Sequence, residues 1–182
     1  GEAAFYGPKL DIQYKNVFGK EDTIVTIQVD QLLAEQFDMS YIDQNGQKVR
    51  PYIIHRTSLG CYERTLALLI EKYAGAFPLW LAPEQVRVMP ISERQADAAK
   101  AVTDQLFAAG LRAEVDLRNE KIGYKIREAQ MQKIPYMVII GEKEAEAGTV
   151  SVRSRHDGDL GSMPVDEFLK LIKEVIDTKA KK

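Results

Sequence analysis

The chain has 182 residues, 45% of them hydrophobic, and a formal net charge of −2. This composition is typical of a folded globular protein, and it excludes a disordered chain and a protein whose overall charge attracts nucleic acid. The single cysteine, Cys61, excludes an internal disulfide and a metal site made of cysteines alone. It fits a small structural residue in a reducing compartment, so we expect a cytoplasmic protein. The sequence has no run of about 18 apolar residues, so we do not expect a membrane-spanning helix.

The beginning of the chain has the alternating pattern of antiparallel strands. Polar and apolar residues alternate over residues 9–14 and 25–30, and the glycine-containing stretch between them predicts a hairpin. Asn45-Gly46 predicts a second tight turn, and another strand is expected over residues 52–55.

A helix is expected next, over residues 61–73, because apolar residues recur there at three- and four-residue spacing. The stripe that it should bury consists of Leu66, Leu69, Ile70 and Tyr73. Pro78 and Pro83 then interrupt the helical period and mark a linker at residues 75–84. We therefore expect two domains, at residues 1–78 and 79–182.

The second domain alternates strands with helices. A layered α/β domain with a mixed, partly parallel sheet follows from this order. Ser92 and Gln95 should form a capping box at the start of the first helix, and Gly110 should end it. Strands are expected over residues 86–91, 111–118, 135–141 and 149–155, and helices over residues 92–110, 120–132 and 165–178. The buried stripes should include Ala98, Val102 and Leu106, and later Phe168, Leu169, Ile172 and Ile176.

The two predicted strands of the first hairpin collect polar side chains on one face. These side chains are Lys9, Asp11, Thr26, Gln28 and Asp30. Such a face can bind a polar ligand, but a sheet face that is simply exposed to water has the same composition. The pattern alone leaves both interpretations open.

His55 and Arg64 flank the predicted turn between the strand at residues 52–55 and the helix that follows. A single histidine on an apolar strand fits a hydrogen-bonded core residue, and the other histidine, His156, is too distant in the sequence for metal-ligand spacing. Arg64 lies in the first helical turn, where a cation opposes the helix dipole and calls for an anion. Glu63 or solvent can also compensate that charge.

A local excess of positive charge lies between residues 118 and 155, where eight Lys or Arg face five Glu. With Asn119 and Tyr124 beside them, these cations suit the recognition of phosphates and unstacked bases of single-stranded RNA. An ordinary solvated helix face is the alternative. The cations on the predicted helix and the late strand are Lys121, Lys125, Arg127, Arg153 and Arg155.

Four stretches of the sequence, in this order, resemble the C-terminal part of a bacterial threonyl-tRNA synthetase, a class II aminoacyl-tRNA synthetase. They are "GEAAFYGPKLDI", "TIQVD", "RPYIIHRTSLGCYERTLALLIEKYAGAFPLWLAP" and "DLRNEKIGYKIREAQMQKIPYMVIIGEKE". The resemblance implies the last part of an antiparallel class II catalytic sheet followed by an anticodon-binding domain.

The resemblance also implies roles for residues of the first domain. Arg64 of "GCYER" matches the arginine of class II motif 3, which contacts ATP, a role that suits a planar guanidinium. His55 matches one of three zinc ligands in a site that selects threonine by its hydroxyl group, beside the nucleotide. Tyr6 and Gln28 match positions around threonine, and Lys9 a position near the adenylate phosphate.

The same resemblance assigns an anticodon-reading surface to the second domain. Its residues are Asn119, Lys121, Arg127, Glu144 and Arg153. The implied reaction uses ATP, Mg²⁺ and Zn²⁺, and the implied partners are threonine, its tRNA and a second copy in the full-length enzyme.

Motifs 1 and 2 of class II enzymes and two of the three zinc ligands are missing, and the sequence starts inside a strand pattern without a methionine. We therefore expect a truncated chain that does not aminoacylate by itself. A prolyl-type synthetase fragment and a non-catalytic tRNA-binding module remain the alternatives.

Overall fold

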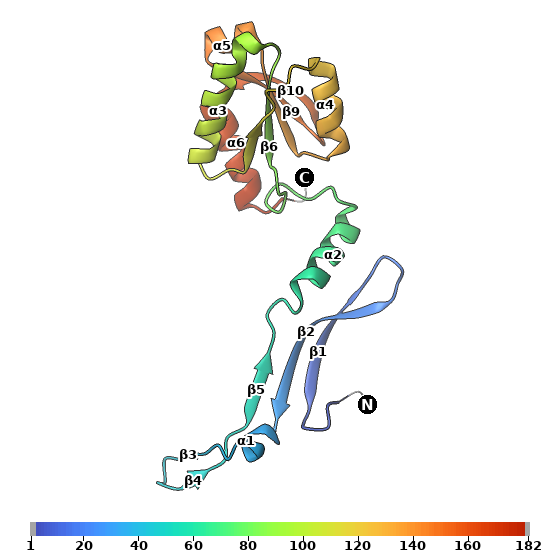
Figure 1. Ribbon diagram of the computed structural model, residues 1–182, viewed down its shortest axis with the longest axis vertical. Coiled ribbons are helices and arrows are strands. Elements are labelled where there is room, and N and C mark those ends of the chain that lie inside the picture. The colour runs from blue at the N-terminus through green and yellow to red at the C-terminus, as the bar shows by residue number, and fades with distance from the viewer. Residues whose placement is uncertain (1–2, 181–182) are drawn as a thin grey trace. The chain divides into compact units, whose positions relative to one another are not determined.

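A computed structural model describes residues 3–180, which divide into two units between Lys72 and Tyr73 (Figure 1). The sequence placed the boundary later, between residues 78 and 79. The residues in between contact the second unit, because Lys133 Nζ donates a hydrogen bond to the Ala74 carbonyl and Arg155 Nη2 donates one to the Phe77 carbonyl at 2.7 Å. We describe each unit by itself.

The first unit is built on a three-stranded antiparallel sheet in the order β1-β2-β5. Its strands are β1 (Lys9–Lys15), β2 (Glu21–Asp30) and β5 (Ile53–Arg56). The predicted hairpin is thereby confirmed, and Asn16 closes its turn by accepting hydrogen bonds from the backbone of Phe18 and Lys20.

The remaining elements of the first unit are short, apart from one helix. They are α1 (Leu33–Gln36), β3 (Tyr41–Ile42), β4 (Lys48–Val49) and α2 (Tyr62–Tyr73). The prediction that α2 buries its apolar stripe is wrong: Leu66 is 53% exposed and Ile70 46%. Among the described residues no second layer covers that side of the helix, so periodicity identified the helix but not its burial.

The second unit contains a five-stranded sheet in the order β10-β9-β8-β6-β7. Strands β6, β7 and β8 are parallel, whereas β9 pairs antiparallel with β8 and with β10. This is the mixed sheet that the sequence predicted. The strands are β6 (Val86–Pro90), β7 (Ala113–Val115), β8 (Tyr136–Ile140), β9 (Thr149–Ser154) and β10 (Gly158–Pro164).

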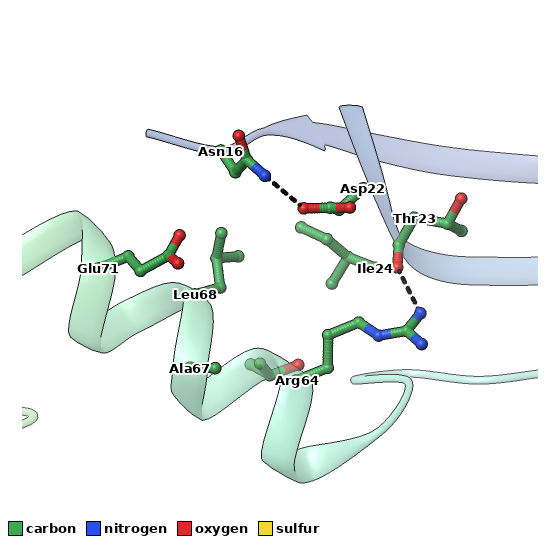
Figure 2. A pocket seen from close by; sticks show the side chains of 9 residues that line it. Asn16, Asp22, Thr23, Ile24, Arg64, Ala67, Leu68 and Glu71 are labelled. Atoms are coloured by element: carbon green, nitrogen blue, oxygen red, sulfur yellow. Dashed lines mark hydrogen bonds between the residues drawn. The ribbon is translucent and has the colours of Figure 1, made fainter. Parts of the chain in front are cut away.

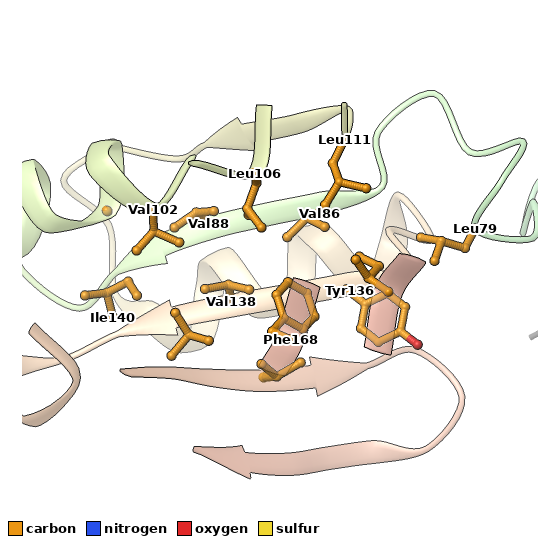
Figure 3. Packing of buried hydrophobic residues seen from close by; sticks show 14 residues of the cluster. Leu79, Val86, Val88, Val102, Leu106, Leu111, Tyr136, Val138, Ile140 and Phe168 are labelled. Atoms are coloured by element: carbon orange, nitrogen blue, oxygen red, sulfur yellow. The ribbon is translucent and has the colours of Figure 1, made fainter. Parts of the chain in front are cut away.

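Helices cover both faces of this sheet, with α3 and α6 on one face and α4 on the other (Figure 1). The larger core lies under α3 and α6, where Phe168 packs edge-on against Tyr136 at a ring-centroid distance of 5.8 Å (Figure 3). The predicted stripes of both helices belong to this core. The helices are α3 (Ala96–Ala108), α4 (Ile122–Met131), α5 (Glu142–Ala147) and α6 (Val165–Asp177).

Sequence patterns missed some features of the second unit. Strand β10 was not predicted because glycines and polar residues dominate it, and α5 was not predicted because it is short and polar. The capping box is wrong: a 3₁₀ turn (Glu93–Gln95) precedes α3, and the Ser92 hydroxyl bonds to the Gln95 side chain at 2.7 Å and not to the backbone.

Candidate functional site

Three polar side chains form a row across the sheet of the first unit. Lys9 of β1 lies opposite Gln28 of β2, which lies opposite His55 of β5. Residues directly opposite one another in antiparallel strands project from the same face, so all three lie on one face. Asp11, Thr26 and Asp30 share this face, since they are two residues from a member of the row. The polar face predicted from the sequence is therefore present.

Tyr6 extends the row from the segment before β1. Its hydroxyl donates a hydrogen bond to Gln28 Oε1 at 2.9 Å, and its ring lies edge-on to His55 at a centroid distance of 6.3 Å. Gly7 allows this approach, because a Cβ there would stand 1.9 Å from the Val29 carbonyl oxygen. Four residues that the family resemblance assigned to threonine, metal or phosphate are thus gathered on one face.

The Asp30 carboxylate is a hydrogen-bond partner of the His55 ring. Asp30 is 5% exposed, and its Oδ2 lies 2.9 Å from His55 Nε2. Its other oxygen accepts the backbone N–H groups of Leu33 and Leu32 at 2.8 and 2.9 Å. These bonds, the one from Leu33 first, hold the pKa of Asp30 below its usual range. Sequence analysis placed Asp30 on the polar face but did not recognise it as the partner of His55.

Lys9 is oriented by a second carboxylate. Lys9 Nζ lies 2.8 Å from Asp11 Oδ2, while Asp11 Oδ1 accepts the Thr26 hydroxyl at 2.8 Å. The hydrogen bond from Lys9 is the main cause that lowers the pKa of Asp11. The ion pair with Asp11 therefore fixes the position of the Lys9 ammonium group on the polar face.

The described residues do not complete a metal site. His55 Nε2 faces Asp30, which leaves Nδ1 as the nitrogen open to a ligand. No group of three histidine, cysteine or carboxylate side chains among residues 3–180 is placed to hold a metal ion. His55 can therefore supply one ligand, and the donor set around it is insufficient for zinc.

Arg64 lies at the other end of β2. Its Nη1 donates a hydrogen bond to the Thr23 carbonyl at 3.4 Å, beside a cavity of ≈ 110 Å³ between α2 and the start of β2 (Figure 2). The turn before α2 is fitted to the sheet by Gly60, whose φ is +65° and where a Cβ would stand 2.2 Å from the Ile24 carbonyl oxygen.

The row and Arg64 are separated along the sheet. Thr23 precedes Gln28 by five residues of β2, and at about 3.3 Å per residue their backbones lie roughly 16 Å apart. Glu63 accepts a hydrogen bond from the Cys61 thiol at 2.9 Å, and no ion pair joins it to Arg64 among the described residues, so Glu63 does not compensate that arginine directly. The sheet therefore carries two separate polar sites, the row of Lys9, Gln28 and His55 and the region around Arg64.

In the second unit, half of the cations between residues 118 and 155 have structural partners. Lys125 is 2% exposed and donates to the carbonyls of Asp116 and Pro90, and Arg155 donates to carbonyls of residues 77 and 133. The expectation that these two residues belong to a basic surface is wrong, because both donate hydrogen bonds to backbone carbonyls; Arg155 Nε is buried without a partner among the described residues. Arg118 and Lys133 are also engaged.

The remaining expected residues lie along the α4 side and the strand ends. Asn119 lines a cavity of ≈ 200 Å³ between the loops that follow β6 and β7, and Lys121 precedes α4. Parallel strands present ligand sites at their carboxyl ends, which is where this cavity lies. Glu144 follows β8, and its Oε2 accepts the Gly141 N–H at 3.0 Å.

Two arginines lie further from that edge. Arg127 is exposed on α4, and Arg153 of β9 pairs with Met137 at the start of β8. No hydrogen bond or ion pair between described residues occupies Lys121, Arg127 or Arg153, so their charges are available to an anion. Sequence analysis did not anticipate that Arg118, next to Asn119, pairs with Asp116 and Glu128.

Comparison with protein families resolves what these two units are. Residues 1–73 match the tRNA synthetase class II core domain of the G, H, P, S and T type, and residues 85–175, half of the chain, match the anticodon binding domain. The chain belongs to the class II aminoacyl-tRNA synthetase family. Its resemblance to that family is thereby confirmed, and so is the layered α/β fold.

Curated relatives of this synthetase chain include threonine–tRNA ligases. It is 63% identical over 171 residues to a threonine–tRNA ligase of Clostridium perfringens and 61% identical over 178 residues to one of Clostridium botulinum. These matches cover 94% and 98% of the chain but only 27% and 28% of the relatives. The chain thus spans about a quarter of the length of the ligases it matches.

Solved structures agree with this placement. The RNA binding domain of threonyl-tRNA synthetase from Cryptosporidium parvum aligns with a TM-score of 0.84 at 35% identity, covering 96% of this chain and 44% of that one. A prolyl-tRNA synthetase of the same organism aligns with a TM-score of 0.75 at 23% identity, covering 97% and 40%. The second match shows the shared fold alone. No helix of residues 3–180 is long and apolar enough to cross a membrane.

Proposed function

We propose that this chain is part of a cytoplasmic threonine–tRNA ligase. The whole enzyme would activate threonine with ATP and Mg²⁺ and then transfer it to the terminal adenosine of its tRNA. The observation that carries this proposal is the 63% identity to threonine–tRNA ligases over 94% of the chain. The row of Lys9, Gln28 and His55 on one sheet face supports it, since residues for amino-acid and phosphate recognition then lie together.

The first unit would supply part of the catalytic site. Tyr6 and Gln28 would hydrogen-bond threonine, and Lys9 would stabilise charge developing on the adenylate phosphate. Arg64 would contact ATP, because a guanidinium can stack on adenine and also bind phosphate oxygens. The fixed ion pair of Lys9 with Asp11 supports its role, because a charge held in place costs little reorganisation during the reaction.

Zinc would contribute selection of threonine through its hydroxyl group. His55 would be one ligand, and two further ligands would have to come from the rest of the enzyme. Asp30 would hold the imidazole ring in one orientation, as carboxylates that accept a ring N–H do for metal-bound histidines.

The second unit would bind the anticodon of the tRNA. Lys121, Arg127 and Arg153 would contact phosphates or base edges, while Asn119 and Glu144 would read bases by hydrogen bonds. The cavity beside Asn119, at the carboxyl ends of parallel strands, supports the entry of an unstacked base there.

A chimera tests the proposal. In a threonine–tRNA ligase relative, the matching segment is replaced by this chain, and threonylation of tRNA is measured. We expect activity to be retained and to fall about 10²-fold or more with Arg64→Ala, since a charged transition-state contact is lost. Arg50→Ala is a matched control on an exposed arginine of the same unit, and it should leave threonylation unchanged. An inactive, folded chimera that still binds tRNA would favour the non-catalytic binding module.

The 182-residue chain by itself should bind tRNA without aminoacylating it. Class II catalysis would also need motifs 1 and 2, which are not among these 182 residues. Measurable threonylation by the isolated chain would contradict this part of the proposal. The homodimer expected for the full-length enzyme is tested separately, by sedimentation of the chimera.

A further inference from the structure

The loop between β7 and α4, residues 116–121, is held in place by the side chains of Arg118 and Lys125. This loop carries Asn119 and Lys121, two of the residues proposed to read the anticodon. The backbone N–H of Asp116 bonds to the Val88 carbonyl at 2.8 Å, which fixes the start of the loop to β6. Beyond that point, one backbone hydrogen bond, from the Glu120 N–H to the Arg118 carbonyl at 2.9 Å, and several side-chain contacts hold the loop.

Arg118 binds the Asp116 carboxylate through both its side chain and its backbone N–H. Its Nε and Nη2 donate to Asp116 Oδ1 and Oδ2 at 2.9 and 2.7 Å, and its backbone N–H donates to Asp116 Oδ1 at 3.1 Å. Asp116 is 8% exposed, so the carboxylate that receives these three bonds is buried. The loop is thereby closed on its own first residue.

The same guanidinium reaches the helix that follows. Arg118 Nη2 also donates to Glu128 Oε2 at 2.5 Å, and the other oxygen of Glu128 accepts the Tyr124 hydroxyl at 3.0 Å. Glu128 lies in the second turn of α4, ten residues beyond Arg118 in the chain. One arginine therefore ties the loop to the body of the helix that carries Arg127.

Lys125 completes the support from the buried side. Its Nζ donates to the Asp116 carbonyl at 2.9 Å and to the Pro90 carbonyl at 3.4 Å, which joins the loops after β6 and β7 beneath the cavity lined by Asn119. The loop is held from below by this lysine and from its outer side by Arg118.

Arg118 is exposed enough to be mistaken for a phosphate contact, since its side chain is 50% accessible. However, two carboxylates already neutralise it, so it offers little net attraction to a polyanion. We infer that Arg118 is a positioning residue that fixes the Asn119–Lys121 loop against α4 so that Asn119 can read an anticodon base. This inference rests on the proposed function and adds a determinant of its specificity.

Arginine is required for this geometry. Its planar fork can bind one carboxylate with two nitrogens and still direct a hydrogen bond to a second carboxylate, whereas a lysine ammonium is a point charge without that fixed orientation. Arg118→Lys therefore keeps the charge of the loop but removes the side chain that joins Asp116 to Glu128. Glu128→Gln keeps Arg118 and removes one charged anchor.

Binding of tRNA by the 182-residue chain tests the inference. Kd is measured at one salt concentration for a threonine tRNA and for the same tRNA with the middle anticodon base replaced. We expect Arg118→Lys and Glu128→Gln each to lower the preference for the unaltered tRNA on the order of tenfold, because one hydrogen-bonded contact is misplaced. Affinity for the altered tRNA should change little. Arg94→Lys, a conservative change of another exposed arginine, should preserve the preference.

Amide hydrogen exchange of the free protein gives a readout that does not depend on RNA. Exchange at residues 118–121 should accelerate in Arg118→Lys and in Glu128→Gln but not in Arg94→Lys. A merely structural role would lower the melting temperature without changing the ratio of the two Kd values.

Other results would overturn the inference. If Arg118→Lys weakens both tRNAs equally and Glu128→Gln strengthens both, Arg118 contacts RNA directly. If the unchanged chain prefers the unaltered tRNA and both variants keep that preference, the positioning role is wrong and the proposed function stands. If the unchanged chain has no preference, anticodon reading fails, and the inference fails with it.

Discussion

The two units of this chain use similar strands but reach very different degrees of burial. In the second unit, helices lie on both faces of the sheet and enclose a core that includes Val138 and Phe168 at 0% exposure. In the described part of the first unit, Ala34 is the single fully buried hydrophobic residue, while Leu10, Ile12 and Ile54 remain more than half exposed. A sheet buries its apolar face only when another layer covers it.

Because of this difference in burial, different interactions stabilise the two units. Packing of apolar side chains orders the second unit, and it is a large, cooperative contribution. The first unit depends on strand pairing, on the close turns at Gly7 and Gly60, and on polar contacts such as that between Asp30 and His55. The polar face of this sheet is accompanied by little apolar burial.

The largest expected effect is removal of a core ring from the second unit. Phe168→Ala should destabilise that unit by about 3–5 kcal/mol, because the ring is fully buried against Tyr136. Trp80, the only tryptophan, lies in the second unit, so its fluorescence during urea denaturation reports this change specifically. Phe107→Ala is the matched control, since Phe107 is 71% exposed. Equal losses in both variants would contradict the account of the core.

A smaller effect is expected from a backbone constraint in the first unit. Gly60→Ala should cost about 1–3 kcal/mol more than Gly46→Ala, because both glycines have positive φ but only a Cβ at Gly60 meets backbone, at the Ile24 carbonyl. The free energy of local opening is measured by hydrogen exchange at the Thr57 amide, which bonds to the Thr26 carbonyl. Equal exchange in the two variants would show that the turn is not tightly fitted to β2.

A charge-dependent effect is expected in the loop of the second unit. The side chain of Arg118, above all, lowers the pKa of Asp116 in the folded protein. Asp116 therefore contributes stability above the pKa of the unfolded chain, and this contribution is lost as the pH falls through the lower, folded pKa. Asp116→Asn should cost about 1–2 kcal/mol at neutral pH and flatten the acid side of the stability profile.

Urea denaturation followed by Trp80 between neutral and strongly acidic pH measures this profile. Asp97→Asn is the matched control, because the Asp97 side chain is fully exposed and lies 3.7 Å from Lys100. An unchanged acid slope in Asp116→Asn would show that the carboxylate does not couple to folding.

The smallest effect is expected on the exposed stripe of α2. Leu66→Ala should change stability by no more than about 0.5 kcal/mol, because the side chain is 53% exposed. Leu106→Ala in α3, where the side chain is 0% exposed, should cost about 2–5 kcal/mol. Thermal unfolding followed by circular dichroism compares the two. A large loss in Leu66→Ala would mean that a second layer covers α2 in solution.

Much of the fold followed from periodicity. The hairpin of β1 and β2, the strands β6 and β8, and the buried stripes of α3 and α6 were predicted because alternation and helical spacing are local properties. Strand β10 was missed because its residues, which include Gly158 and Gly161, have no such alternation. Its pairing with β9 decides that it is a strand, and pairing is not a local property.

The candidate site was predicted less evenly. The family resemblance supplied residues such as His55 and Asn119, but no local pattern distinguishes a free cation from an engaged one. Lys125 and Arg127 are two residues apart in the sequence. Lys125 is buried and donates hydrogen bonds to two backbone carbonyls, whereas Arg127 is exposed. The helix orientation decides this, since positions two apart on a helix point to different sides.

The sequence by itself determined the two-part organisation, the strands and helices with strong periodicity, the polar face of the first hairpin and the synthetase family. Only the tertiary structure decided that Asp30 meets His55, that Arg118 closes its loop onto Glu128, and that α2 leaves its stripe exposed. The physical reason is the distance in the sequence over which each interaction acts. Backbone preference and amphipathicity act between near neighbours, whereas burial, strand register and the pairing of charges depend on residues that only folding brings together.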